Sequence, residues 1–147
     1  MKVGLLGTGF GIAHARIYHI HPQVSSVVVF GRTPAKLQAF ADEFGYATTT
    51  DPASIYDDPT IDLIDVCLPT TLHADHVTQA LDAGKHVLCE LPLTTTMADA
   101  HRVVDAAAAR AARTSRVSWR LSSTLAGLRR DVSRPWQQAI TWSITAA

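Results

Sequence analysis

Three alternate glycines, Gly7, Gly9 and Gly11, follow a short apolar run close to the start of the chain. A run of this length that breaks into glycines and continues as a helix-forming segment is typical of a buried parallel strand entering a tight turn. Such a turn presents backbone N–H groups at a helix N-terminus, where the partial positive charge favours a phosphate. We therefore expect Gly7 to make the turn and Gly9 to let the backbone approach a pyrophosphate.

The spacing of these glycines departs from the dinucleotide-binding fingerprint G-x-G-x-x-G/A. The small residue that the fingerprint requires falls on Ile12, whereas Gly11 lies one place early and Ala13 one place late. Ala13 is the candidate for the close contact between helix and strand in a longer variant of the motif. Because a glycine-rich turn is often only a turn, the motif alone leaves both nucleotide binding and a structural turn open.

The end of the second apolar run indicates which dinucleotide would bind. An NAD site usually has Asp or Glu there, about 20 residues after the glycines, to bind the ribose 2′-hydroxyl. This sequence has Gly31 at that place, followed by Arg32 and Thr33. Because an arginine can pair with a 2′-phosphate through two hydrogen bonds and lie against the adenine, the pattern favours NADP(H) over NAD(H). The alternative is a solvated arginine at a helix start.

Strands and helices that would position these residues alternate over the first 112 residues. We expect strands at 3–6, 24–30, 46–50, 61–68 and 85–90, and helices at 12–20, 34–44, 51–58, 72–83 and 94–112. This alternation predicts an α/β fold, a Rossmann-type doubly wound parallel sheet with right-handed crossovers. Ligands on such sheets bind outside the carboxyl ends of the strands. The segments expected along that rim are 7–11, 31–33, 69–73 and 90–92.

The composition of the chain changes near Ala112. Residues 1–112 contain 7 Lys and Arg against 12 Asp and Glu, whereas residues 113–147 contain 6 Arg, a single acid and all three tryptophans. We expect a dinucleotide-binding domain at 1–112 and an Arg/Ser/Trp-rich tail at 113–147, disordered or loosely docked, with one amphipathic turn within 121–128. Arginine and tryptophan also occur together on nucleic-acid surfaces, but no binding motif accompanies them, so no nucleic-acid partner is expected.

The sequence shows neither the pattern of a membrane segment nor that of a disulfide framework. No apolar run reaches the ~18 residues of a membrane span, and the N-terminus lacks the pattern of a signal peptide. Cys67 and Cys89 lie in apolar, strand-like runs. We expect them to be free buried thiols in a cytoplasmic protein, although a bridge is conceivable if their strands are neighbours.

Two histidine pairs, His19/His21 and His73/His76, have spacings that metal sites also use. No matching cluster of cysteines or carboxylates accompanies either pair. We therefore expect surface or capping histidines and no metal site.

Three stretches together carry a resemblance to a known family. They are the turn Gly7-Thr8-Gly9-Phe10 with His14 nearby, the segment IDLIDVCLPTTLH at 61–73, and the segment AGKHVLCELPL at 83–93. Together they resemble the N-terminal half of the Gfo/Idh/MocA family (glucose–fructose oxidoreductase, inositol dehydrogenase, rhizopine catabolism). The similarity covers residues 1 to about 112, and the third stretch is far more specific than the glycines.

The resemblance implies an NAD(P)-dependent oxidoreductase that acts on a sugar or polyol. It also implies that the loop after the fourth strand and the following helix start line the ribose and nicotinamide side of the cofactor. The glutamate of the family's Glu-Lys-Pro motif reaches the nicotinamide ribose. With the residues described above, the expected cofactor contacts are Gly7, Thr8, Gly9, Phe10, Gly11, Arg32, Thr33, Leu68, Pro69, Thr70, His73 and Glu90.

The chain departs from this family in two respects. Leu91 stands at the place of the motif's lysine, which in the family helps to position substrate and tune proton transfer. Leucine can do neither. Family members also continue into a substrate domain that supplies an acid/histidine pair, whereas about 35 residues remain here. A truncated or frameshifted reading of a longer gene would produce this pattern.

These departures set the functional expectation. We expect the nucleotide-binding domain of a sugar or polyol oxidoreductase, with no catalytic residue of its own. A small sugar or polyol would bind only where a second domain is supplied. The alternative is a non-catalytic nucleotide-binding or partner-binding fragment. A sheet edge left uncovered by the missing domain predicts self-association into a homo-oligomer.

Overall fold

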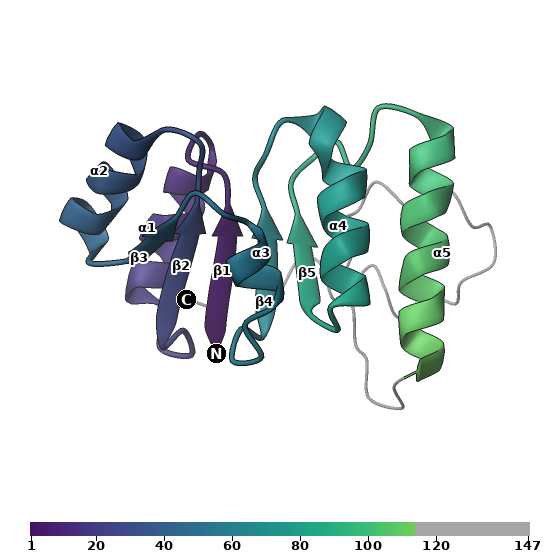
Figure 1. Cartoon of the computed structure of the whole chain (residues 1–147), viewed down its shortest axis with the longest axis horizontal. Helices are drawn as coiled ribbons and strands as arrows, with labels where there is room; N and C mark the ends of the chain where they lie inside the picture. The colour runs from purple at the N-terminus through teal and green to yellow at the C-terminus, as the bar shows by residue number, and fades with distance from the viewer. Residues whose placement is uncertain (114–147) are drawn as a thin grey trace.

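The computed structural model describes residues 1–113 of the chain, with side chains through Arg110. The expectations for the tail, including the amphipathic turn within 121–128, lie outside the described residues. Strands and helices alternate along the described part (Figure 1). In chain order they are β1 (Lys2–Leu6), α1 (Gly11–Ile20), β2 (Ser26–Phe30), α2 (Pro34–Phe44), β3 (Ala47–Thr49), α3 (Ala53–Tyr56), β4 (Leu63–Val66), the 3₁₀ turn η1 (Thr70–Leu72), α4 (His73–Asp82), β5 (His86–Cys89) and α5 (Met97–Arg113).

The five strands form one parallel sheet in the order β3-β2-β1-β4-β5, which confirms the predicted Rossmann-type α/β fold. The first strand lies at the centre, and the chain winds outward from it in both directions. Leu6, the last residue of β1, is level with Phe30 at the end of β2 and with Val66 at the end of β4. The carboxyl ends of the three central strands therefore meet at one rim.

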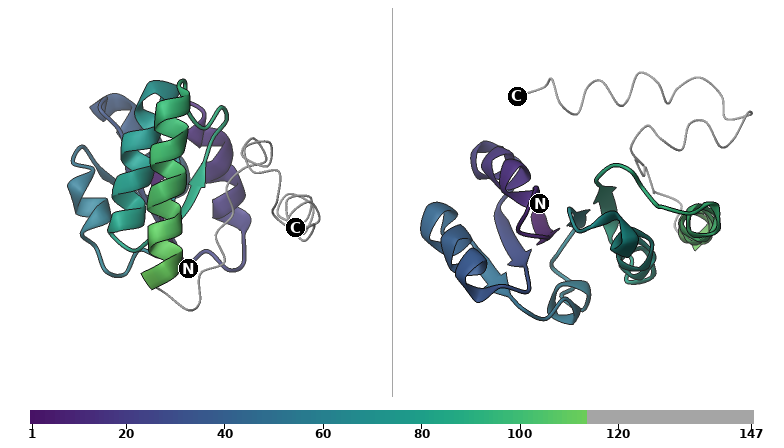
Figure 2. Two further views of the ribbon diagram at one scale, coloured as in Figure 1. Left: turned by 90° about the vertical axis from the view of Figure 1, so that its right-hand side faces the viewer. Right: turned by 90° about the horizontal axis from the view of Figure 1, so that it is seen from above.

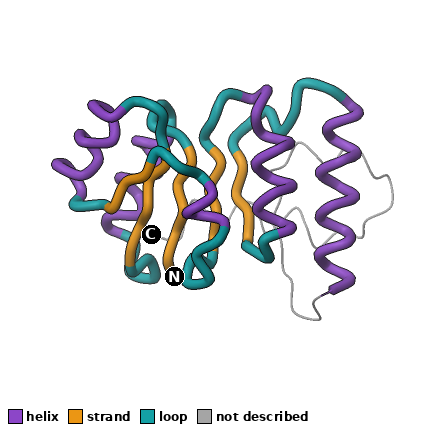
Figure 3. The backbone as a smooth tube through the Cα atoms, viewed as in Figure 1, coloured by secondary structure: helices purple, strands orange, loops and turns teal. Residues whose placement is uncertain are grey.

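Backbone hydrogen bonds continue past the strand ends and fix the loops of this rim. Gly7 N–H donates to Phe30 O at 3.0 Å, and Cys67 N–H donates to Leu6 O at 2.8 Å. Glu90 N–H donates to Val66 O at 3.0 Å in the same way. The loops that leave the strand ends gather along one side of the sheet in Figure 3. Each loop thus starts from a backbone position that the neighbouring strand holds.

Helices cover the sheet from both faces, and each face has its own core (Figure 2). Val3, Leu5, Val27 and Val29 point toward α1 and α2, where Ala15, Leu37 and Phe40 meet them. The opposite core, beneath α3, α4 and α5, contains Leu6, Phe30, Ile55, Tyr56, Ile61, Ile64, Val66, Ala74, Val77, Ala80, Leu81, Cys89, Leu93, Val103 and Ala107. Strands buried on both faces explain the nearly continuous apolar runs in the sequence.

The structure corrects several predicted boundaries. The second and fourth strands are shorter than predicted, because Val24 and Ile61 lie in turns where their N–H groups donate to His21 O and Asp58 O. The helix expected at 72–83 begins at His73, after a 3₁₀ turn. Thr33 precedes α2, but its side chain makes no capping hydrogen bond. The helix expected at 34–44 has these bounds in the structure, and Gly45 ends it in the left-handed conformation, at φ +70°.

Candidate cofactor-binding site

Gly7 makes the turn at the end of β1, and no other residue type fits there. Its φ is +117°, outside the range that side chains favour. A Cβ at this position would lie 2.5 Å from the carbonyl oxygen of Cys67. That oxygen belongs to backbone held in the sheet, so it has little freedom to move. The turn therefore brings the chain across the end of β4 and directs it into α1.

Gly9, in contrast, faces open space. A Cβ added to Gly9 would meet no atom within 4 Å, and the residue is exposed. It lies just ahead of α1, whose N-terminus has no side-chain capping hydrogen bond within the described structure. The N–H groups of Ile12 and Ala13 donate to the carbonyl oxygens of Gly9 and Phe10, at 3.3 and 2.9 Å, and no described side chain caps the helix start. A helix N-terminus without a side-chain cap, beside an unfilled backbone cradle, is what a pyrophosphate requires. The residues present at this turn thus fit a dinucleotide.

The close contact between α1 and the sheet is made by Gly11 and Ala15, both buried. A Cβ on Gly11 would lie 3.5 Å from Leu5 and 3.6 Å from Cys67, at ordinary contact distance. Ala13, the residue proposed for this contact, is only half-buried. Ile12 packs at the edge of the core instead of filling the cradle. The irregular spacing of the fingerprint is therefore accommodated by a helix that begins at Gly11.

Gly31, Arg32 and Thr33 follow the end of β2. Gly31 is buried, and a Cβ there would lie 2.6 Å from Cγ2 of Thr8. A carboxylate side chain at this position would therefore require Thr8 to move. Arg32 and Thr33 are both exposed. The rim beside the glycine turn thus offers a cation and a hydroxyl where NAD sites usually offer an acid.

The loops after β4 and β5 are tied together by His73. Its side chain is 1% exposed, with Nδ1 3.0 Å from the carbonyl oxygen of Pro92 and Nε2 2.7 Å from that of Leu68. Both ring nitrogens are thus engaged by backbone. The expected contact between His73 and a cofactor is corrected accordingly: this histidine holds the two loops, while the half-buried Leu68 and Thr70 and the exposed Pro69 form the surface.

A charged cluster joins α1 to the ends of β4 and β5. His14 Nδ1 lies 2.6 Å from Asp65 Oδ2, and His14 Nε2 lies 2.9 Å from Glu90 Oε1. The hydroxyl of Tyr18 donates to the same Asp65 oxygen at 2.7 Å. The thiol of Cys67 donates to Asp65 Oδ1 at 3.5 Å. Asp65 is fully buried, so these hydrogen bonds replace the solvation that its carboxylate has lost.

The cluster shifts the protonation of its members. The hydrogen bond to Asp65, aided by the charges of Asp65 and Glu90, raises the pKa of His14 against the opposing effect of burial. Burial, with the Asp65 charge adding to it, raises the pKa of the Tyr18 hydroxyl and of the Cys67 thiol. Both groups therefore stay protonated and donate to Asp65 at neutral pH.

Sequence reasoning missed this cluster, although its signals were present. Asp65 and Cys67 are two residues apart on one strand and so point to the same face of the sheet. His14 and Tyr18 are four residues apart on α1 and so share one side of the helix. A carboxylate in an otherwise apolar strand needs a partner on the helix that covers it. Only the register between α1 and β4 had to come from the structure.

The two cysteines are free and buried, as predicted. Cys67 belongs to the core beneath α1 and α2, whereas Cys89 belongs to the core beneath α4 and α5. Side chains on opposite faces of a sheet cannot bridge, so the conceivable disulfide is excluded. Burial also raises the pKa of the Cys89 thiol to about 12.

The histidine pairs considered for metal binding do not converge. His19 packs against the rings of Phe44 and Tyr46, and His76 forms a hydrogen bond with the Tyr56 hydroxyl. Side chains of His14, Asp65 and Cys67 do gather, with one donor atom of each within 4.8 Å of the others. Their mutual hydrogen bonds account for that proximity without an ion.

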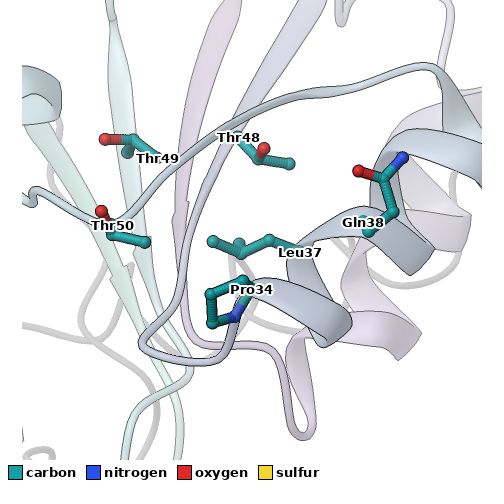
Figure 4. A pocket seen from close by; sticks show the side chains of 6 residues that line it. All are labelled: Pro34, Leu37, Gln38, Thr48, Thr49 and Thr50. Atoms are coloured by element: carbon teal, nitrogen blue, oxygen red, sulfur yellow. The ribbon is translucent and has the colours of Figure 1, made fainter.

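A surface pocket of 430 Å³ lies elsewhere, between α2 and β3 (Figure 4). None of the twelve residues expected to contact a cofactor lines it. We therefore place the candidate site at the rim and not in this pocket. Its lining is formed by Pro34, Leu37, Gln38, Thr48, Thr49 and Thr50.

The parallel sheet, the glycine turn and the uncapped helix start define a Rossmann domain of the dinucleotide-binding class. Residues 1–117 match the Gfo/Idh/MocA family model, described as "Oxidoreductase family, NAD-binding Rossmann fold". The chain belongs to this family. Among the described residues, no helix is both long and apolar enough to span a bilayer.

Individual relatives are sugar-converting enzymes. Levoglucosan dehydrogenase of Pseudarthrobacter phenanthrenivorans is 36% identical over 117 residues, which cover 72% of this chain and 30% of that protein. A solved levoglucosan dehydrogenase in complex with NADH and levoglucosan has a TM-score of 0.68 at 33% identity, covering 75% of this chain and 32% of that one.

A third relative was solved with the other dinucleotide. KijD10, a 3-ketoreductase from Actinomadura kijaniata in complex with NADP, has a TM-score of 0.69 at 28% identity, covering 75% of this chain and 34% of that one. The family thus includes relatives solved with NADH and with NADP. The chain spans about a third of the length of the relatives that it matches.

Proposed function

We propose that this chain is the NADP(H)-binding domain of a sugar or polyol oxidoreductase. The observation that carries the proposal is the open cradle at Gly9, ahead of the uncapped start of α1. In this proposal the segment from Gly7 to Gly11 holds the pyrophosphate through backbone N–H groups, with Thr8 and Phe10 flanking it. The nicotinamide dinucleotide, when bound, supplies the hydride chemistry.

Arg32 and Thr33 are proposed to select the cofactor. Both are exposed beside Gly31, where the side chain of an acid would meet Thr8. A guanidinium group at this place can pair with a 2′-phosphate through two parallel hydrogen bonds. Since relatives were solved with NADH as well as NADP, the preference rests on these residues alone.

Leu68, Pro69, Thr70 and Glu90 are proposed to line the ribose on the nicotinamide side. The N–H of Leu91 donates to Glu90 Oε2 at 3.2 Å, and His14 holds Oε1, so both carboxylate oxygens are oriented at the rim. His73 contributes by fixing the loops that carry these residues. An acceptor so placed can bind ribose hydroxyl groups.

A binding domain without turnover is the second candidate, and one observation favours it. Leu91 is 50% exposed at the rim, at the position where the family's motif has lysine. A leucine there can neither donate a proton nor carry a charge. Turnover would then depend on groups from outside residues 1–113.

A binding titration with a matched variant tests the proposal. We expect NADPH to bind the purified full chain and to raise its melting temperature. Gly9→Ala should keep the stability of the chain, since its Cβ meets nothing, yet lower NADPH affinity at least about tenfold by filling the cradle. Equal affinity in Gly9→Ala would refute this placement. Oxidation of a polyol by the chain with NADP⁺ would decide against the second candidate.

A further inference from the structure

We propose that His14 is a positioning residue for dinucleotide binding: as an imidazolium it bridges the buried Asp65 to Glu90 and so holds the Glu90 carboxylate in place at the rim. This inference rests on the proposed function, because Glu90 is the group through which His14 would act on the cofactor. His14 itself contacts Glu90 from α1 and is not proposed to contact the cofactor.

The geometry requires a histidine that donates from both nitrogens. Asp65 Oδ2 lies 2.6 Å from Nδ1, and Glu90 Oε1 lies 2.9 Å from Nε2. Ionised carboxylates only accept hydrogen bonds, whereas neutral imidazole has a single N–H. A neutral His14 would therefore set a nitrogen lone pair against one of the two carboxylates. The imidazolium satisfies both.

The contacts of Asp65 decide which carboxylate loses its position when His14 loses its proton. Asp65 is fully buried, and it also accepts from the Tyr18 hydroxyl and the Cys67 thiol. Its carboxylate is therefore fixed and cannot turn to follow His14. Glu90 has fewer partners: its side chain is 31% exposed at the end of β5, and besides His14 its carboxylate accepts from the N–H of Leu91. Loss of the proton from His14 should therefore release Glu90 and leave Asp65 in place.

Within residues 1–110, the titratable groups that the structure places against His14 come from three elements. Asp65 and Cys67 come from β4 and its end, Tyr18 from α1, and Glu90 from the end of β5. Cys89, also on β5, lies on the other face of the sheet. Asp65 raises the pKa of His14 above the ordinary value near 6.5, with a smaller contribution from Glu90. The bridge is therefore complete at low pH and is lost as pH rises through the raised pKa.

The prediction is a pH-dependent affinity that requires His14. Between pH 7 and 9 a 2′-phosphate is already mostly dianionic, since its second pKa is about 6, so its own titration adds little. Over that range we expect the Kd of wild-type chain for NADPH to rise about tenfold, as one charge-assisted hydrogen bond is lost. The Kd for NADH should rise by a similar factor.

Three variants isolate the bridge. His14→Gln and Glu90→Gln should each flatten the pH profile, because each variant lacks the ion pair between residues 14 and 90 at every pH in this range. His19→Gln, on the same helix but packed against aromatic rings, should keep the wild-type profile. Asp65→Asn should move the midpoint of the profile to lower pH, because it removes the largest contribution to the raised pKa. Should Asp65→Asn fail to fold, the other three variants still decide.

The test uses the full chain, with fluorescence titrations for Kd and NMR titration of the histidine ring protons. The NMR signal that His14→Gln removes should titrate above the ordinary histidine range without any cofactor present. Wild-type binding that is independent of pH, or a pH profile unchanged by His14→Gln, would overturn the inference alone. Failure of the wild-type chain to bind NADPH or NADH at any pH would contradict the proposed function, and this inference with it.

Discussion

Replacing Gly7 with alanine should destabilise the chain far more than the same replacement at Gly45, another glycine with positive φ. At φ +117° a side chain adds strain of about 1 to 3 kcal/mol. The new Cβ would also lie 2.5 Å from the oxygen and 2.8 Å from the carbon of the Cys67 carbonyl. Cys67 N–H is bound to Leu6 O at 2.8 Å, so relief requires β1 and β4 to separate at the rim.

Overpacking of this kind adds about 1 to 3 kcal/mol to the strain. We therefore expect the free energy of unfolding to fall by about 4 kcal/mol, a large share of the 5–15 kcal/mol typical of a domain. Urea denaturation followed by circular dichroism measures it. Gly45→Ala is the control: it has φ +70° and no atom within 4 Å of the added Cβ, so only about 1 to 2 kcal/mol of strain is expected. A Gly7→Ala variant no less stable than Gly45→Ala would refute the argument.

Two further predictions concern the cofactor and the thiols. Arg32→Ala should weaken NADPH binding about tenfold while leaving NADH affinity within about twofold. Lys36→Ala, in the first turn of α2, should change neither affinity. An equal loss for both cofactors in Arg32→Ala would remove the basis for preferring NADP(H). Thiol titration should find Cys67 and Cys89 both reduced after exposure to air and unreactive until the chain is denatured, because they are buried on opposite faces of the sheet; a Cys67–Cys89 disulfide in the peptide map would contradict that placement.

The overall fold could be predicted because its signals are local. The change from Leu6 to Gly7 marks the end of a buried strand, and Gly45 marks the end of a helix, whatever surrounds them. Alternation of strands and helices then restricts the topology, since parallel strands need crossovers of fixed hand. The errors were confined to boundaries, where apolar residues such as Val24 and Ile61 lie in turns.

The site could be predicted only in part, because side-chain pairing is not local. The sequence placed Gly9 and Arg32 near one rim, and the structure agrees with that placement. It could not show that His73 turns inward to two backbone carbonyls, because this depends on where the loops after β4 and β5 lie. Nor could it join His14 to Asp65 and Glu90, which are 51 and 76 positions further along the chain.

The most direct test of the account is a crystal structure of the full chain grown with NADPH. We predict that the pyrophosphate lies over Gly9 at the start of α1, with the 2′-phosphate beside Arg32 and a ribose hydroxyl on Glu90. A structure in which the turn from Gly7 to Gly11 stays empty at saturating NADPH, or in which the dinucleotide lies in the pocket between α2 and β3, would contradict it.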